Sequence, residues 1–314
     1  MRRPNLRKRL AALGAGTALA TLASMGTATA AEPQLNGAWE PFTRCPVDAP
    51  AMLATDGLAQ VPQCVVSHSA GGSIKLGNTT VTTGATNLQF GVVQNSDGTN
   101  TVVAPPAGSI IADSAYVPGG MLGLMCPSDI PVISYICGQI ENGAVNGIEA
   151  TVESVGTPSD YNQVAAILTG QTIVSIPVRV KLENPFLGDN CYIGSASEPI
   201  ILQPQNTVAP SVGVERFNGD GSANPAGEMS RLNLAGATQA DTTFSVPGAT
   251  GCGLDWGLIN SVVNLKTGLP SPSGNNSLVL NNAQTHLGGF FAAGTHAPNA
   301  GRLLSDNWHS AVQQ

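Results

Sequence analysis

The sequence predicts a mainly β fold: an antiparallel sandwich or barrel-like domain with two short helices and three disulfides. Three observations lead to this prediction. Short runs of alternating apolar and polar residues recur along the chain, as in strands that are buried on one face. The 37 Gly and 22 Pro residues are frequent enough to end most elements early. Six cysteines follow an N-terminal segment typical of secreted proteins, which predicts disulfides.

The clearest strand runs from Ile173 to Leu182, where apolar residues occupy every second position. Pro177 predicts an edge or a bulge there, because proline donates no ladder hydrogen bond. A hairpin is predicted from Leu88–Gln94 and Thr101–Val103, since Asp97-Gly98 between them favours a tight turn. This spacing suits an antiparallel sheet rather than parallel βαβ units. Further short strands are predicted at Ser73–Leu76, Thr79–Thr82, Glu198–Leu202 and Ser277–Leu280.

Two segments have helical spacing instead. From Pro131 to about Asn142, apolar residues recur every three or four positions, and Pro131 suits a first helical turn. Leu254–Lys266 repeats the pattern, with Asp255 in its first turn and Gly268 beyond its last, as the helix dipole and the C-cap favour. These are the two short helices of the predicted fold.

The first 30 residues have the three parts of a secretory signal peptide. Met1–Arg9 carries five basic residues and no acid, Leu10–Met25 is uncharged, and Ala28-Thr29-Ala30 supplies small residues for cleavage. The uncharged stretch of 16 residues is shorter than the roughly 20 that a membrane-spanning helix needs. We therefore expect a signal peptide at 1–30 and a single secreted, extracellular β-rich domain at 31–314. The alternative is that this domain consists of two subdomains that meet near 150–170.

The charge of the chain excludes some classes of partner. Without residues 1–30 it keeps eight basic and twenty acidic residues, a net charge near −12. Nucleic-acid binding is excluded, because it needs a basic patch that neutralises phosphates. No later stretch indicates a transmembrane span, so we expect no stable membrane insertion. The oligomeric state stays open.

The six cysteines are predicted to be structural. Many pairings are compatible with the sequence, and we take pairing between neighbours as the prediction: Cys45–Cys64, Cys126–Cys137 and Cys191–Cys252. No Cys-x-x-Cys motif and no His at ligand spacing accompanies them, so no metal and no cofactor is expected. Residues 218–224 alternate like a calcium loop, but Met229 stands where the closing glutamate should be. A polar turn explains that segment better.

A serine hydrolase needs a nucleophile, a histidine base and an acid that orients the histidine. The segment Ser67-His68-Ser69-Ala70-Gly71-Gly72 is similar to a lipase elbow, although the residues after it indicate a strand rather than a helix. Asp306 and His309 are three residues apart and favour one face of a turn. The candidate triad is therefore Ser69, His309 and Asp306. The alternatives are a plain Gly-rich turn at Ser69 and a C-terminal turn held by a buried Trp308.

Six stretches carry a family resemblance and span most of the chain after residue 30: Gly37–Pro46, Gly72–Thr79, Leu122–Pro131, Asn184–Tyr192, Leu265–Pro270 and Asn307–His309. They resemble a family of secreted actinobacterial proteins, some of which are described as cholesterol esterases. The resemblance implies a hydrolase that acts on sterol esters of long fatty acids. It does not identify the nucleophile.

Two functions follow as expectations. The first is a secreted carboxylic-ester hydrolase that acts on sterol esters through a serine. The second is a non-catalytic secreted β-sandwich that coats the cell surface or binds an envelope component. An apolar ester or lipid requires an apolar groove, and the uncharged segment 117–125 is the candidate lining. Its substrate contacts would be Met121, Leu122, Leu124 and Met125, since methionines adapt to irregular apolar shapes; the alternative is a buried connection into the Pro131 helix.

Overall fold

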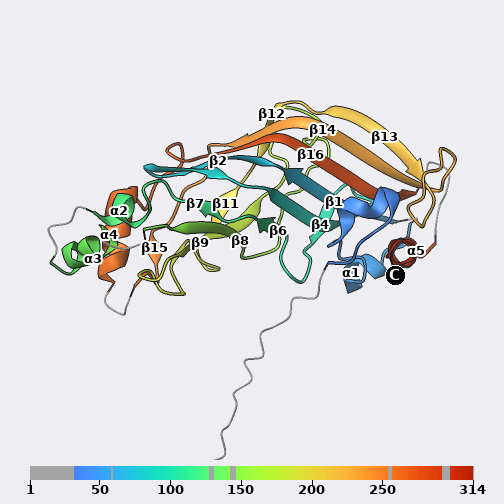
Figure 1. The fold of residues 1–314 in the computed structure, drawn as a ribbon. Helices are drawn as coiled ribbons and strands as arrows, with labels where there is room; N and C mark the ends of the chain where they lie inside the picture. Colours follow the sequence, from blue (N-terminus) through green and yellow to red (C-terminus); the bar gives the residue numbers. More distant parts are fainter. Residues whose placement is uncertain are drawn as a thin grey trace, which may run out of the picture. The chain divides into compact units, whose positions relative to one another are not determined.

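The computed structural model describes residues 32–313, apart from residue 58 and the segments 127–130, 142–145, 254–256 and 292–297. Residues Pro33–Gln314 form one compact unit. Within it, strands dominate and every pairing is antiparallel (Figure 1). The two sheets are open rather than closed into a barrel. The predicted antiparallel, mainly β fold is confirmed.

The first sheet consists of β1 (Gln60–Ser69), β2 (Gly71–Leu76), β3 (Thr79–Thr83), β4 (Thr86–Asn95), β5 (Asn100–Val103), β6 (Ile110–Ala112), β12 (Gln205–Val208), β13 (Ser211–Phe217), β14 (Met229–Asp241) and β16 (Ser277–Phe291). Its main path is β12-β14-β16-β1-β4-β5, with β13 on β14, β6 on β4, and the β2–β3 hairpin on β16. Gln94 of β4 pairs with Asn100 of β5, so the predicted hairpin is confirmed.

The second sheet consists of β7 (Ala115–Tyr116), β8 (Glu149–Ser154), β9 (Ile176–Glu183), β10 (Tyr192–Ile193), β11 (Ile200–Leu202) and β15 (Ala249–Thr250). The order is β15-β10-β9-β8-β7, and β11 also pairs with β9. The edge position predicted from Pro177 is wrong, because β9 has partners on both sides. Pro177 is tolerated since it lies just past Ser154–Val178, the last residue pair between β8 and β9.

The main core lies between the two sheets. Side chains alternate along a strand, so Val65 of β1 joins Phe90 and Leu287 on the inner face of the first sheet. The second sheet contributes buried residues at every second position of β9, from Ile176 to Leu182. This is the alternation that predicted the strand.

A second core covers the outer face of the first sheet. Val66 of β1 points into it, together with side chains from η1 (Gly37–Phe42), α1 (Pro50–Leu53) and α5 (Ala300–Ser310). Trp39 is fully buried and meets Phe217 edge to face, with ring centroids 5.5 Å apart. Trp308 of α5 donates its indole N–H to the carbonyl of Phe42 at 2.9 Å. Strand β1 is therefore buried on both faces.

The segments that begin and end the described unit lie side by side. Leu35 forms an antiparallel bridge with Val312. The amide of Asn36 donates to the carbonyl of Ala311 at 2.8 Å, and the amide of Gln313 donates to Gln34 at 2.9 Å. Both segments help to close the second core, because Leu35 and Ala311 are buried in it.

More helices are present than the sequence predicted. Helices α3 (Pro131–Glu141) and α4 (Leu258–Thr267) correspond to the two predicted ones, although residues 254–256 of the second lie outside the described residues. Helix α2 (Gly120–Met125) packs beside them in Figure 1. Helix α5 was expected only as a turn. Its buried stripe consists of the widely spaced Ala300, Leu304 and Trp308, which is the i, i+4, i+8 pattern of a surface helix.

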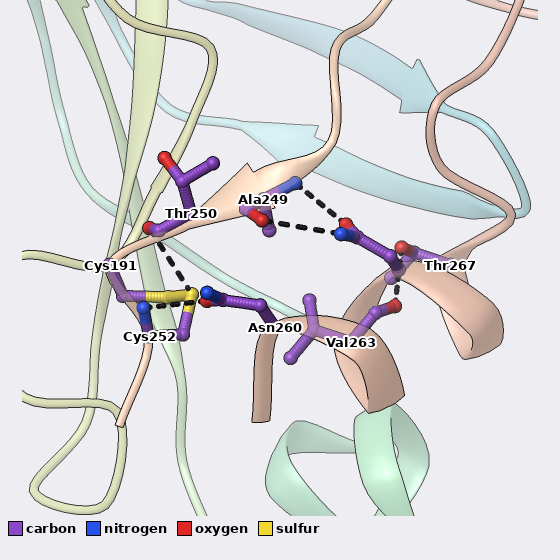
Figure 2. Close-up of a disulfide and its surroundings, with 8 residues drawn as sticks. Cys191, Ala249, Thr250, Cys252, Asn260, Val263 and Thr267 are labelled. Atoms are coloured by element: carbon purple, nitrogen blue, oxygen red, sulfur yellow. Dashed lines mark hydrogen bonds between the residues drawn. A yellow bond between two sulfur atoms is a disulfide. The ribbon is translucent and has the colours of Figure 1, made fainter. Parts of the chain in front are cut away.

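The three predicted disulfides are present and join Cys45 to Cys64, Cys126 to Cys137 and Cys191 to Cys252. Figure 2 shows the third one beside β15 and α4. There Asn264 serves both backbone groups of Ala249: its oxygen accepts the N–H at 2.6 Å, and its amide donates to the carbonyl at 3.2 Å. Asn260 accepts the N–H of Cys252 at 2.8 Å. These side chains hold the helix against the short strand.

No helix among the described residues is long and apolar enough to cross a membrane.

The disulfide loops predict unequal losses of stability. Cys191–Cys252 closes a loop of 61 residues and Cys126–Cys137 one of 11. Replacing both cysteines of the longer loop by alanine should lower the free energy of unfolding by about 2–5 kcal/mol, since the unfolded chain gains freedom. The same change at Cys126–Cys137 should cost about 1.5 kcal/mol less. Urea unfolding of both double variants measures the difference, and equal losses would contradict the loop argument.

Candidate functional site

An apolar cavity of about 100 Å³ lies between the two sheets. Its walls are the inner faces of both sheets, so residues far apart in the sequence meet there. The first sheet contributes Ile74, Leu76, Val81, Leu88, Leu278 and Leu280, and the second contributes Ala150, Val152, Ile176, Val180, Leu182 and Ile193.

The space exists because the lining side chains are aliphatic and often small. None of the described residues that line the cavity is aromatic, and alanine occupies positions 112, 115 and 150. The aromatic rings of the main core, such as Phe90 and Phe244, lie outside the cavity lining. Trp39, Phe42 and Phe217 are fully buried in the second core. Protein interiors are normally packed as densely as organic crystals. A cavity in the middle of a sandwich core is therefore a local exception.

The cavity reaches the surface where the β3–β4 bend meets the connection between β6 and β7. Half-buried Thr83 and Thr86 and the exposed Asp113 belong to its lining there. The amide of Asp113 donates to the carbonyl of Ala85 at 2.9 Å, and its carboxylate accepts the amide of Ala85 at 3.2 Å. These two hydrogen bonds fix the carboxylate at the mouth.

Ser69, the predicted nucleophile, lies in the cavity wall at the end of β1. Ser69 is almost fully buried, and its hydroxyl oxygen lies 2.9 Å from the carbonyl oxygens of both Gly71 and Asn281, between which its single proton is shared. A backbone carbonyl cannot act as a general base. The residues after Ser69 form strand β2 rather than a helix. Ser69 therefore does not occupy a lipase elbow.

The predicted triad is not assembled. His309 lies on α5, which covers the outer face of the first sheet, whereas Ser69 faces the inner side. Leu304 of α5 packs near Gln63, and Ser69 lies six residues farther along β1, roughly 20 Å away at about 3.3 Å per residue. Asp306 is exposed. The spacing of Asp306 and His309 does not make them partners, because a carboxylate from a distant part of the sequence lies next to the imidazole.

That carboxylate belongs to Asp48. His309 Nε2 lies 3.0 and 2.9 Å from its two oxygens, and the hydroxyl of Ser305 donates to it at 2.6 Å. Burial opposes ionisation of Asp48, but the hydrogen bonds from Ser305 and His309 outweigh it and hold the pKa of this carboxyl below its ordinary value. The group attaches α5 to the segment before α1.

Of the predicted substrate groove at 117–125, Val117 does line the cavity, whereas Gly120–Met125 form the packed helix α2. Met121 is fully buried in the main core, and Leu122 is half-buried against it. Backbone amides of both residues donate to Asn146, at 2.8 and 2.9 Å. Neither residue lines the cavity. The side chains of Leu124 and Met125 lie outside the described ones.

Among the described residues, no cluster of three or more His, Cys, Asp or Glu side chains could hold a metal ion. The calcium-like segment is a polar turn, as its sequence suggested. Asn224 donates to Asn218 at 2.6 Å, and Asp220 accepts both the amide and the hydroxyl of Ser222. These oxygens therefore accept hydrogen bonds from donors of the same loop.

The lining residues were missed as site residues although their strands were partly predicted. The alternation at Ser73–Leu76 and Thr79–Thr82 marks Ile74, Leu76 and Val81 as inward-facing. Nothing in the local pattern says that two inward faces leave a space between them, because that depends on the sheet opposite.

His286 is a half-buried histidine on β16 that faces the outer side of the first sheet. Its Nδ1 lies 2.7 Å from Asn233 Oδ1, and because a carboxamide oxygen only accepts, Nδ1 carries the proton. Burial and the neighbouring Arg231 lower the pKa of His286 to about 4, against an opposing effect of Glu215. The imidazole is therefore neutral in the fold.

This pKa predicts a stability that depends on pH. An unfolded histidine titrates near 6.5, so between about pH 6.5 and 4 the unfolded chain binds more protons than the folded one. As the pH is lowered from about 6.5 to about 4, the free energy of unfolding should therefore fall by about 1 kcal/mol. This value is reduced for the partial solvent access of the ring. In His286→Gln the fall should be smaller by this amount, with only the contribution of carboxylates such as Asp48 remaining, while His68→Gln, at an exposed position of the same sheet, should keep the full fall. Urea unfolding at several pH values tests this, and an unchanged slope in His286→Gln would refute it.

Comparison with family models, with curated proteins and with solved structures finds no match to this chain.

Proposed function

We propose that the protein binds the hydrocarbon chain of a lipid in the cavity between its two sheets. The observation that carries this proposal is the cavity itself, which is lined mostly by aliphatic side chains and has the exposed Asp113 at the edge of the sandwich. Ligand sites are mostly apolar concavities with a few polar groups that orient the ligand. Here Thr83, Thr86 and Asp113 are the polar groups that lie at the mouth. This is the non-catalytic class of function, with a lipid as the bound component.

The size of the cavity favours a single chain. An aliphatic cavity of about 150 Å³ holds one benzene, and this one measures about 100 Å³, so as it stands it holds only a few methylene groups. A longer ligand needs the sheets to separate, and a thin methylene chain needs a smaller separation than a fused sterol nucleus. The acyl chain is therefore the part of an ester that fits best.

The place of action that we propose is extracellular. Three disulfides support it, since such bonds persist in oxidising compartments, and the signal-like residues 1–30 agree with it.

Filling the cavity should abolish binding. In Ala150→Phe, a ring replaces a methyl group that lines the cavity. Thr151→Phe adds the same ring on the opposite face of β8 and serves as the control. A neutral fluorescent probe, N-phenyl-1-naphthylamine, should bind the unmodified protein and Thr151→Phe alike and bind Ala150→Phe at least about ten times more weakly. Circular dichroism verifies folding. Equal binding by a folded Ala150→Phe, or none by the unmodified protein, would refute the proposal.

Ester hydrolysis is a second candidate, because the family resemblance implies an esterase and Ser69 lines this same cavity, although Ser69 hydrogen-bonds to no histidine among the described residues and a general base would have to come from elsewhere. It predicts that an organophosphonate probe forms an adduct with Ser69, found by mass spectrometry. Ser69→Ala should then abolish the release of fatty acid from cholesteryl esters, while Ser67→Ala, in the same wall, should keep it. Without an adduct on any serine and without hydrolysis above buffer, this candidate is rejected and lipid binding stands alone.

A further inference from the structure

One fully buried hydroxyl in the described lining of the cavity has no hydrogen-bond partner. Among the buried side-chain oxygens and nitrogens without a hydrogen bond in the described part of the chain, only Thr83 Oγ1 belongs to a lining residue. Three other hydroxyls of the wall have partners: Ser67 pairs with Thr285 at 2.8 Å, Thr267 donates to the carbonyl of Val263 at 2.6 Å, and Ser69 contacts the carbonyls of Gly71 and Asn281. A buried polar group without a partner is destabilising, and native proteins retain few of them.

Thr83 stands where the cavity opens. It is the last residue of β3, and the adjacent Gly84 approaches Asp113 so closely that a Cβ there would collide with the Asp113 side chain. Asp113 is held in turn on Ala85 by its two hydrogen bonds. In a ligand whose chain lies between the sheets, the polar end would therefore lie beside Thr83, with Asp113 farther out toward the solvent.

The charges around this opening discriminate between polar ends. The described lining contains no Lys, Arg or His, and Asp113 is its single charged residue. A carboxylate or phosphate end would meet a like charge with no basic group to offset it. An ammonium end would have to stay at the exposed Asp113, because an unpaired charge beside Thr83 would lose its hydration. A neutral oxygen is the partner that satisfies Thr83.

We propose that the bound lipid is uncharged and carries a hydroxyl or carbonyl oxygen that hydrogen-bonds to Thr83 Oγ1. This inference rests on the proposed function and specifies its ligand: an uncharged single-chain lipid, such as a long-chain alcohol, rather than a fatty acid anion. The oxygen lies at the mouth and the chain lies between Leu182 and Leu280 on the facing walls.

The test compares lipids that share one chain and differ at one end. Dodecanol, dodecanoate and dodecylamine compete with N-phenyl-1-naphthylamine for the full-length protein, near pH 8 where the acid and the amine are charged, and below their micelle concentrations. Dodecanol should displace the probe at about a tenfold lower concentration than dodecanoate. In Asp113→Asn, dodecanoate should gain affinity while dodecanol stays unchanged.

The variants at Thr83 isolate the hydrogen bond. Thr83→Val should bind dodecanol about ten times more weakly and the probe equally well, and it should not melt at a lower temperature, since it loses an unsatisfied group. Thr83→Ser should retain the affinity for dodecanol. Thr82→Val, on the exposed side of the same strand, is the matched control and should behave like the unmodified protein.

Each other outcome rejects the inference. Tighter binding of dodecanoate, or unchanged dodecanol affinity in Thr83→Val, would exclude the role of Thr83. Tightest binding of dodecylamine would assign the mouth to a cation. If the probe binds but the three lipids compete equally, only this inference fails. If the probe does not bind at all, the proposed function fails with it.

Discussion

Burial of strand β1 on both faces is the constraint on which the rest of the fold depends. Val65 packs between the sheets, and Val66 packs under the helices of the second core. Because side chains alternate with a period of two, a shift of the register by one residue would exchange these environments. The pairings with β4 and β16, and the bond from Cys64 to Cys45, hold the register from three sides. This register places Ser69 in the cavity wall, and it presents the other face of β1 to α5.

The two cores differ in what fills them. The second core has interlocking rings, with Trp39 in edge-to-face contact with both Phe42 and Phe217, and such contacts fix the geometry of their neighbours. The cavity region between the sheets has branched aliphatic chains and alanines. In a chain with only 4% aromatic residues, the part of the described main core that contains no aromatic ring is the part that leaves room for a ligand.

Local patterns in the sequence predicted local features. The alternation along Ile176–Leu182 and the turn at Asp97-Gly98 are short-range signals, and the structure contains the strand and the hairpin that they predict. The candidate triad is not assembled because Ser69 and His309 lie on opposite faces of the first sheet, and the acid beside His309 is Asp48, 261 residues away in the sequence. Local spacing in the sequence cannot predict a contact between residues so far apart. The cavity was missed for the same reason, since its walls belong to strands that only the folded chain brings face to face.

The adjacency of Leu35 and Val312 has a consequence for the order of folding. A chain made from its N-terminus presents Trp39 and Phe42 long before Trp308 exists to cover them. The second core therefore closes only after synthesis of almost the whole sequence, and its contacts are among the longest-range in the protein. Contacts of high sequence separation form slowly. During this interval, the rings of Trp39 and Phe42 are exposed apolar surface that favours aggregation. We expect a chaperone to bind the unfinished chain at this surface.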